Sequence, residues 1–280
     1  MPPTAISLAV VPTPILDESP ASWLMRLCQL HEIWPLKLFN ILRMGKMNDF
    51  DRQLEIKHLS VLTHGAGVRM ERLVCLASKF QNVRAEKLCM AFLLGPDQQA
   101  AHYRFCPECL AADEIPYWRF TWRMSYYKFC PMHRSELHGR CNNCNQRVAP
   151  IARMSAAFGS SNPFVCFCHA CGNDLRQCDQ KNVGDLEALE HALDLQRIIT
   201  AAVIRGHYAV KGVEGPFPLS TLPRTLSLGG YPYKEKEMDL PIPANESWKL
   251  GRVNPLMIRA LRQLLLKKSD EAARDSATSY

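Results

Sequence analysis

Four pairs of cysteine-type ligands lie within residues 106–171, and they constrain the fold of this chain more than any other feature. The two members of each pair are separated by two residues, which lets a short turn direct both side chains at one metal ion. The first two pairs together make a Cys₃His set, and the next two make a Cys₄ set. Both sets are typical of closed, structural zinc sites. The predicted ligands are Cys106, Cys109, Cys130, His133, Cys141, Cys144, Cys168 and Cys171.

The last pair leaves a choice of ligands open, because Cys166 and His169 stand next to it. We favour Cys168 and Cys171, since a Cys-x-x-Cys-Gly turn directs backbone N–H groups at the sulfur atoms. Cys166 is then a packed thiol. The other cysteines fall outside the pairs and are interpreted as core residues. They are Cys28, Cys75, Cys89 and Cys178.

The cysteines do not suggest disulfide bonds, which are typical of small secreted domains. At 280 residues, 47% of them hydrophobic, the chain is long enough for one large domain or two to three small ones. No signal peptide is evident, since the first basic residue is Arg26. No apolar stretch approaches the roughly 20 residues that span a bilayer. These features predict a cytoplasmic protein.

The formal net charge of +7 counts every cysteine as neutral. A Cys₃His zinc site carries about −1 and a Cys₄ site about −2, so two filled sites leave the protein mildly basic. Composition therefore permits a nucleic-acid partner without requiring one.

The N-terminal part reads as a series of helices. Ser19 is a good N-cap before Pro20, and the first helix is predicted to close or kink at Pro35. A second helix is expected over residues 36–44, stopping at Gly45. Residues 48–80 read as two helices around a turn at residues 64–67.

This outline fits a DNA-type helix-turn-helix, and a plain helical hairpin with a glycine turn fits equally well. Arg69, Arg72 and Lys79 on its second helix are candidate contacts for nucleic acid or a partner, or else a solvated face.

A further helix is predicted over residues 84–94, and strand-like pieces are predicted over residues 117–129. The aromatic residues there could stack bases, but we favour the core of a small zinc module. Arg119 and Arg123 between them are candidates for phosphate or protein contact.

The C-terminal part begins with a helix from Gly184 to Arg205 that ends at Gly206. Residues 211–247 are rich in Pro, Gly and Ser. A basic helix that carries Arg259 and Arg262 follows, and then a polar tail predicted to be disordered.

The expected fold is mainly α with small zinc-ribbon or zinc-finger β elements. Five parts are predicted along the chain. They are an N-terminal helical, helix-turn-helix-like domain (1–100), tandem zinc modules (101–180), a helix packing on the zinc region (181–210), a linker or surface loop (211–247), and a basic helix with its tail (248–280).

The order of the motifs resembles the TniQ family of transposon target-selection proteins over roughly residues 10–205. Three features carry this resemblance. They are Pro12-x-Pro14 before Glu18-Ser19-x-x-Ser22-Trp23-Leu24-x-Arg26-Leu27; Cys106-Pro107-x-Cys109-Leu110, Trp118-Arg119, Trp122 and Cys130-Pro131-x-His133-x-x-x-Leu137; and Cys141-x-x-Cys144 with its partner pair. The resemblance implies that the eight predicted ligands hold two structural Zn²⁺ ions.

The resemblance also implies partners. Proteins of this family link target recognition to an AAA+ ATPase, which recruits the transposase. Some relatives bind target DNA directly, and others contact a CRISPR effector complex with its guide RNA. Proteins of this family can form dimers, so a homodimer is a further partner that the resemblance allows. The lack of a long apolar stretch, rather than the resemblance, predicts no membrane association.

An enzymatic function is not expected, because both predicted metal sets are complete with four protein ligands. A catalytic zinc keeps one position open for water or substrate. The His-x-Glu and Pro-Cys-x-x-Cys signature of zinc deaminases, a phosphate-binding loop and a nucleophile elbow are all missing from the sequence. The alternatives to a transposition adaptor are a zinc-containing, sequence-specific transcription regulator and, less favoured, a zinc hydrolase or nuclease.

Overall fold

The structure, a computed structural model, describes residues 8, 10–66, 69–85, 87–95, 101–149, 164–208 and 216–222. The predicted basic helix with Arg259 and Arg262, the tail, and most of the loop at 211–247 lie outside the described residues. None of the helices in the described part combines the length and apolar character needed to cross a membrane.

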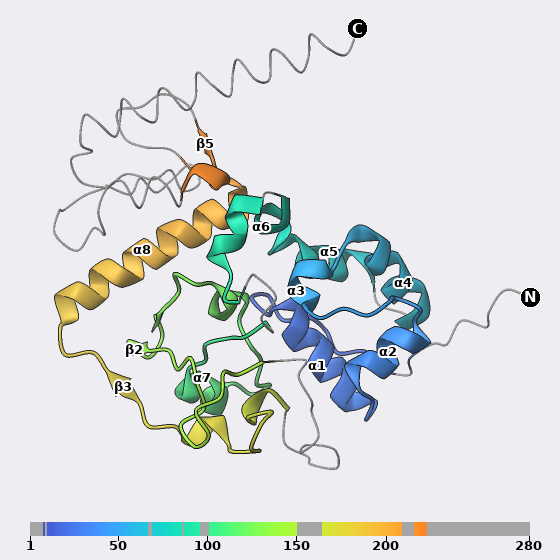
Figure 1. The fold of residues 1–280 in the computed structure, drawn as a ribbon, viewed down its shortest axis with the longest axis horizontal. Coiled ribbons are helices and arrows are strands. Elements are labelled where there is room, and N and C mark those ends of the chain that lie inside the picture. Colours follow the sequence, from blue (N-terminus) through green and yellow to red (C-terminus); the bar gives the residue numbers. More distant parts are fainter. Residues whose placement is uncertain are drawn as a thin grey trace, which may run out of the picture.

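The described chain is mainly helical with a few short strands, as predicted. Figure 1 shows α1 to α5 gathered on one side and the segments around α7 and β1 to β3 on the other. The helix α8 runs along the outer edge of the second group. The helices are α1 (Pro20–Leu30), α2 (Pro35–Ile41), α3 (Phe50–Gln53), α4 (Ile56–Ala66), α5 (Met70–Ser78), α6 (Gln81–Ala85), α7 (Pro107–Ala112) and α8 (Leu186–Arg205).

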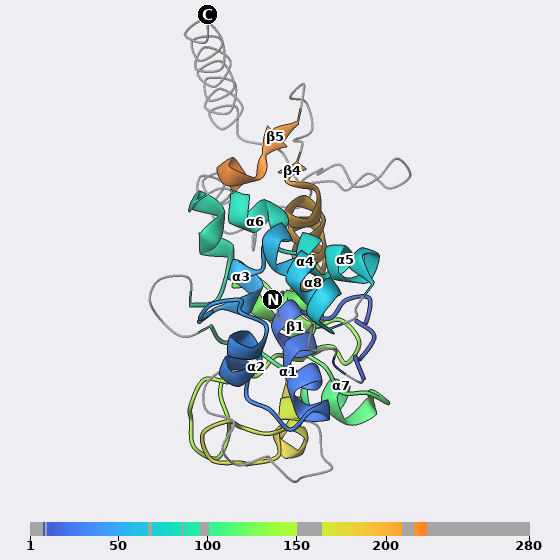
Figure 2. The ribbon, with the colours of Figure 1, turned by 90° about the vertical axis from the view of Figure 1, so that its right-hand side faces the viewer.

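The strands form two small antiparallel sheets. β1 (Phe129–Cys130), β2 (Ser135–Glu136) and β3 (Lys181–Asn182) make the first, in that order, with Cys130 opposite Ser135 and Glu136 opposite Lys181. β4 (His207–Tyr208) and β5 (Phe217–Pro218) make the second. Figure 2 shows this second sheet beyond the end of α8, at the opposite end of the molecule from the loops of residues 164–178.

The start of α1 is as predicted, because local signals determine it. The Ser19 hydroxyl accepts a hydrogen bond from the Ser22 N–H at 3.1 Å, and Pro20 takes the first helical position. The role predicted for Pro35 is wrong, since α1 ends at Leu30 and Pro35 begins α2 instead. A proline lacks the N–H that a first helical residue does not use, so it starts a helix more readily than it continues one.

The prediction of two helices over residues 48–80 is also wrong, because the structure has three. Asp49 caps the additional short helix α3 by accepting a hydrogen bond from the Arg52 N–H at 3.2 Å. The predicted turn at residues 64–67 is helical as far as Ala66, the end of α4, and Gly67 lies outside the described residues.

Two further predictions of secondary structure are corrected. The helix expected over 84–94 is divided between α6 and a 3₁₀ helix at Lys87–Phe92. The expected strands over 117–129 are replaced by a 3₁₀ helix at Phe120–Arg123, and only Phe129 belongs to a strand.

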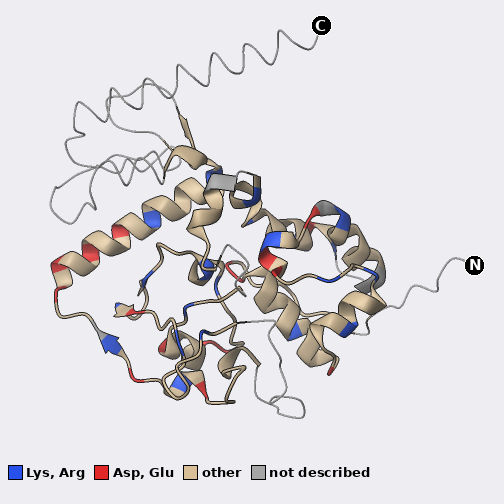
Figure 3. Cartoon of the chain, viewed as in Figure 1, with Lys and Arg blue, Asp and Glu red and all other residues tan. Residues whose placement is uncertain are grey.

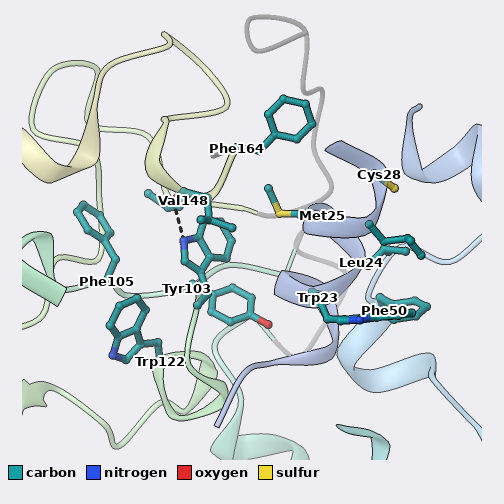
Figure 4. Packing of buried hydrophobic residues seen from close by; sticks show 14 of the residues in the cluster. Trp23, Leu24, Met25, Cys28, Phe50, Tyr103, Phe105, Trp122, Val148 and Phe164 are labelled. Carbon is teal, nitrogen blue, oxygen red and sulfur yellow. Dashed lines mark hydrogen bonds between the residues drawn. The ribbon is translucent and has the colours of Figure 1, made fainter. Parts of the chain in front are cut away.

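One hydrophobic core joins the N-terminal helices to the metal-ligand region. It extends from Trp23 and Leu24 on α1 to Phe105, Trp118 and Trp122, all of them almost fully buried. Figure 4 shows α1 side chains facing those of Tyr103, Val148 and Phe164 across this core. The interpretation of the aromatic segment as core is therefore confirmed for Tyr117, Trp118, Phe120 and Trp122, which are buried. The domain boundary predicted near residue 100 stays a prediction.

A second core lies under α8. Ile198, Ile199 and Val203 on this helix pack with residues such as Phe80 and Phe120. The side chain of Gln196 also fixes α8 to β1, since its Oε1 accepts the N–H groups of Lys128 and Phe129 at 2.6 and 2.8 Å.

The ends of α8 follow local signals. The helix begins at Leu186, two residues later than the predicted start at Gly184, and Asp185 is its N-cap. It ends at Gly206, which is its C-cap. The φ of Gly206 is 78°, a left-handed conformation that glycine adopts without a steric penalty.

Candidate metal centres

The first four predicted ligands come together in one cluster. Their ligand atoms all lie within 4.8 Å of one another. The His133 Nδ1 is 3.4 Å from the Cys106 Sγ, and the Cys109 and Cys130 Sγ atoms are 3.5 Å apart. The three cysteines are buried and the histidine is half-buried. Four donors at these separations surround a point that a single metal ion could occupy.

The remaining four ligands form a second cluster of the same size. The Sγ atoms of Cys141 and Cys171 are 3.7 Å apart, and those of Cys144 and Cys168 are 3.6 Å apart. The competing residues lie outside this cluster. Cys166 is fully buried, and the His169 Nδ1 accepts a hydrogen bond from the Ala149 N–H at 3.4 Å.

Three of the four ligand pairs sit on turns of one kind. In each turn the residue after the second ligand has a positive φ, and its N–H donates to the carbonyl of the first ligand. These residues are Arg134, Asn145 and Gly172, with φ of 54°, 57° and 74° and hydrogen bonds of 2.8, 2.9 and 2.8 Å. The sequence signal was clear only at Gly172, because Arg and Asn adopt this conformation without any distinctive motif.

The first pair is held differently. Cys106 is the N-cap of α7, and Pro107 takes the first helical position, so Cys109 lies within the first turn of the helix. A turn of helix brings two residues three apart to the same face. The Cys-Pro-x-Cys sequence therefore places both sulfur atoms by starting a helix.

The thiols of the first cluster compete for protons. Hydrogen bonds within the cluster move their pKa values in opposite directions, lowering that of Cys106 and raising those of Cys109 and Cys130. A bound divalent cation removes this competition by taking all three sulfur atoms as thiolates. Three thiolates with one imidazole, and four thiolates, are the donor sets that zinc takes in closed sites. Both clusters therefore fit a structural metal ion.

The two clusters differ in exposure. Cys171 is exposed and Cys144 is half-buried, whereas the cysteines of the first cluster are buried. Burial alone would raise the pKa of Cys171, but hydrogen bonds from the Asn173 N–H and the Asn143 side chain lower it to about 7. The Asn143 Nδ2 lies 3.5 Å from the Cys171 Sγ. The second centre is thus open to solvent and reagents on one side.

The interpretation of the other cysteines as core residues holds for three of them. Cys28, Cys89 and Cys178 are buried. Cys75 is exposed, so this prediction is wrong for it. It lies beside Val74 on the solvent face of α5, where helical periodicity places it away from Leu73 and Leu76.

Arg123 does not lie where a phosphate or a partner could reach it, contrary to expectation. Its side chain is completely buried, with its Nη2 2.7 Å from Asp49 and its Nε 3.7 Å from Asp51. Arg119 is mostly buried as well and pairs with Asp113 at 3.0 Å. Both arginines carry structural ion pairs within the fold.

The predicted contacts on α5 are also largely explained by contacts within the chain. The Arg72 Nη1 donates to the Thr13 hydroxyl at 2.8 Å, and the Lys79 ammonium donates to the Glu18 carbonyl at 3.1 Å. Arg69 is exposed just before the helix. The exposed positions of α5 itself are Glu71, Val74, Cys75 and Ser78. This face is not basic, which disfavours α5 as a helix that reads DNA.

The fold and the clusters define a class, namely a mainly helical protein built around two tandem four-ligand metal modules. Residues 9–137 match the family model described as TniQ, and over this region the chain is similar to proteins of that family. The match includes α1 to α7 and the whole first cluster, and the second cluster follows it. The resemblance over residues 138–205 stays a prediction. No curated protein matches the chain.

Proposed function

We propose that this protein is a target-selection adaptor in DNA transposition. It would connect a target, either DNA itself or an RNA-guided CRISPR effector complex on DNA, to the AAA+ ATPase that recruits the transposase. The observation that carries the proposal is the TniQ match over residues 9–137. The family is associated with transposition, and the adaptor role is the finer assignment proposed here.

The chemistry of the two centres supports an adaptor rather than an enzyme. Each cluster offers four protein ligands, which complete the tetrahedral shell of a Zn²⁺ ion. We therefore propose two structural zinc ions and no catalytic activity. The zinc ions would hold the loops of residues 106–171 in place, because metal binding contributes folding free energy in modules of this kind.

The test is a pull-down of the tagged full chain from its native cell. Bound proteins are identified by mass spectrometry, and bound nucleic acid by sequencing. The expected result is recovery of an AAA+ ATPase with transposition proteins, and nuclease treatment before capture separates direct contacts from those bridged by DNA. Recovery of a CRISPR effector with guide RNA, or of one DNA site, would identify the kind of target.

Two controls accompany this experiment. The tag alone measures background, and the paired variant Lys57→Gln with Arg197→Gln, which changes two exposed charges, measures nonspecific electrostatic capture. Recovery of RNA polymerase and a set of promoters without an ATPase would contradict the adaptor role and support a transcription regulator instead.

A further inference from the structure

The turn between α1 and α2 exposes large apolar side chains to solvent. Leu30, the last residue of α1, is 53% exposed, and Leu36, in the first turn of α2, is 52% exposed. Val10, which is 59% exposed, is held at the same turn, since its carbonyl oxygen lies 2.6 Å from the His31 Nε2. Figure 2 shows α1 and α2 side by side. Single apolar residues are common on a protein surface, but several around one turn indicate a contact surface for another molecule.

Three cations lie on α2 and on the segment that follows it. Lys37, Arg43 and Lys46 are exposed, and none of their side chains makes an ion pair or a hydrogen bond with another described residue. The stretch of residues 30–48 contains one acid, Glu32. In Figure 3, blue positions mark α2 and the segment that leads from it to α3. The exposed leucines therefore stand beside an excess of positive charge.

The helical spacing of α2 places apolar and cationic side chains on one face. Leu38 and Phe39 are buried against the core, whereas Leu36, Lys37 and Asn40 are exposed. Residues three or four apart on a helix are neighbours on its surface, so Asn40 lies next to both Leu36 and Lys37. One molecule bound to this face would contact both kinds of side chain.

Arg43 occupies a backbone position that favours glycine. At the end of α2, the Arg43 N–H donates to the Asn40 carbonyl at 3.2 Å, and the Met44 N–H donates to the Phe39 carbonyl at 2.9 Å. This pair of hydrogen bonds requires a left-handed residue, and Arg43 has a φ of 53°. A residue with a Cβ adopts that conformation at a steric cost that glycine does not have. Arg43 is therefore better explained by a contact of its guanidinium than by the backbone of the helix end.

We propose that this surface binds an acidic amphipathic segment of a partner protein. The apolar side chains of the segment cover Leu30 and Leu36. Its carboxylates pair with Lys37, Arg43 and Lys46. An apolar centre with a polar rim is the usual composition of a protein interface, and complementary charges at the rim accelerate association and select the partner.

Two other occupants fit these groups less well. A nucleic-acid backbone pairs with cations through its phosphates but leaves the exposed leucines uncovered. A second copy of this chain offers the acidic residues of α8, but Glu190 and Asp194 there already pair with arginines of their own chain. The experiment distinguishes all three occupants.

The experiment introduces the photo-crosslinking residue benzoylphenylalanine in place of Asn40, in the full chain and in its native cell. The control carries it in place of Glu187, an exposed residue of α8, which Figure 1 shows on the opposite side of the molecule from α2. Mass spectrometry identifies the crosslinked segment. The expected adduct is a segment of another protein with apolar residues at helical spacing and Asp or Glu between them. An adduct with nucleic acid or with another copy of this chain, or no adduct above the control, would overturn the proposal.

The crosslinked segment, made as a fluorescent peptide, is then used to measure binding by anisotropy. Leu36→Ser, and the double variant Lys37→Gln with Lys46→Gln, each weaken binding on the order of tenfold. The matched control, Lys181→Gln with Arg197→Gln, removes the same charge from exposed positions on β3 and α8 and binds as the wild type does. Unaltered binding by both test variants, or equal weakening in the control, would contradict the assignment.

A third variant separates binding from folding. Arg43→Gly removes the guanidinium and relieves the left-handed backbone, so it weakens binding of the peptide severalfold while the melting temperature stays the same or rises. Unaltered binding, or a lower melting temperature, would show that Arg43 serves the end of α2 and would overturn its assignment as a contact.

The outcome is separable from that of the adaptor role. An acidic amphipathic adduct supports the binding surface whichever protein carries the segment. The adaptor role depends instead on recovery of the AAA+ ATPase in the pull-down, so failure of one assignment leaves the other standing.

Discussion

The ion pair between Glu18 and Arg26 is expected to fix the start of α1. Replacing only one of the two residues is expected to lower the free energy of unfolding strongly. The Glu18 side chain is completely buried and lies 2.7 Å from the Arg26 Nη1. It also accepts hydrogen bonds from the Ser22 hydroxyl at 2.9 Å and the Ile15 N–H at 3.1 Å. Burial raises the pKa of Glu18 more than Arg26 lowers it, so the pair does not fully offset the desolvation of the carboxylate.

The magnitude follows from these contacts. Glu18→Ala leaves a largely buried guanidinium without its carboxylate, and breaking a buried pair in this way costs about 3–5 kcal/mol. That is a large share of a typical folding free energy of about 5–15 kcal/mol. Arg26→Ala leaves the carboxylate buried and costs a similar amount. The double variant removes both charges, so its cost falls short of the sum by about 2 kcal/mol.

The assay is urea unfolding followed by far-UV circular dichroism, with zinc in excess for all four proteins. Ser60→Ala, a change at a half-buried position on α4, serves as the control and is expected to shift stability by less than about 0.5 kcal/mol. Additive costs, with coupling below about 0.5 kcal/mol, would refute the reasoning, because they would mean that the pair does not interact.

Three other predictions concern the metal centres, the buried acid and the packing of α8. A chelator should remove metal from the second centre before the first, because Cys171 is exposed. A zinc indicator should then report two release steps, each of one metal ion per chain. Release of both ions in a single step would contradict this prediction. Burial raises the pKa of Asp51 to about 6, so the stability this carboxyl contributes is complete below about pH 4 and declines as pH rises through about 6. As the pH rises from 5 to 7, the free energy of unfolding of Asp51→Asn, measured with urea, should therefore increase relative to that of the wild type by about 1 kcal/mol. If the stabilities of the two proteins changed in parallel with pH, the raised pKa of Asp51 would be contradicted. Gln196→Ala should cost about 2 kcal/mol in the same assay, because the N–H groups of Lys128 and Phe129 lose the Gln196 acceptor. A change below about 0.5 kcal/mol would show that water replaces the side chain.

The parts of the fold that the sequence predicts well are those that local chemistry determines. Ser19 and Pro20 start α1, Gly206 ends α8, and the spacing of the ligand pairs predicts both clusters. Each of these signals acts over a few residues, through a side chain that caps a helix, a glycine that adopts a positive φ, or a turn that aims two ligands.

The features that sequence reasoning missed depend on contacts between distant segments. Arg123 reads as a surface cation, and only the fold shows that it is buried beside Asp49 and Asp51. Long-range pairings of this kind leave no periodic signal along the chain.

The most direct test of this account is the metal content of the full chain. Native mass spectrometry, with elemental analysis of the same sample, should find two zinc ions per chain. Cys109→Ser and Cys144→Ser should each reduce that number and lower the content of folded protein. A chain that folds without metal, or that holds both ions after either substitution, would contradict the central claim that two four-ligand zinc modules organise this protein.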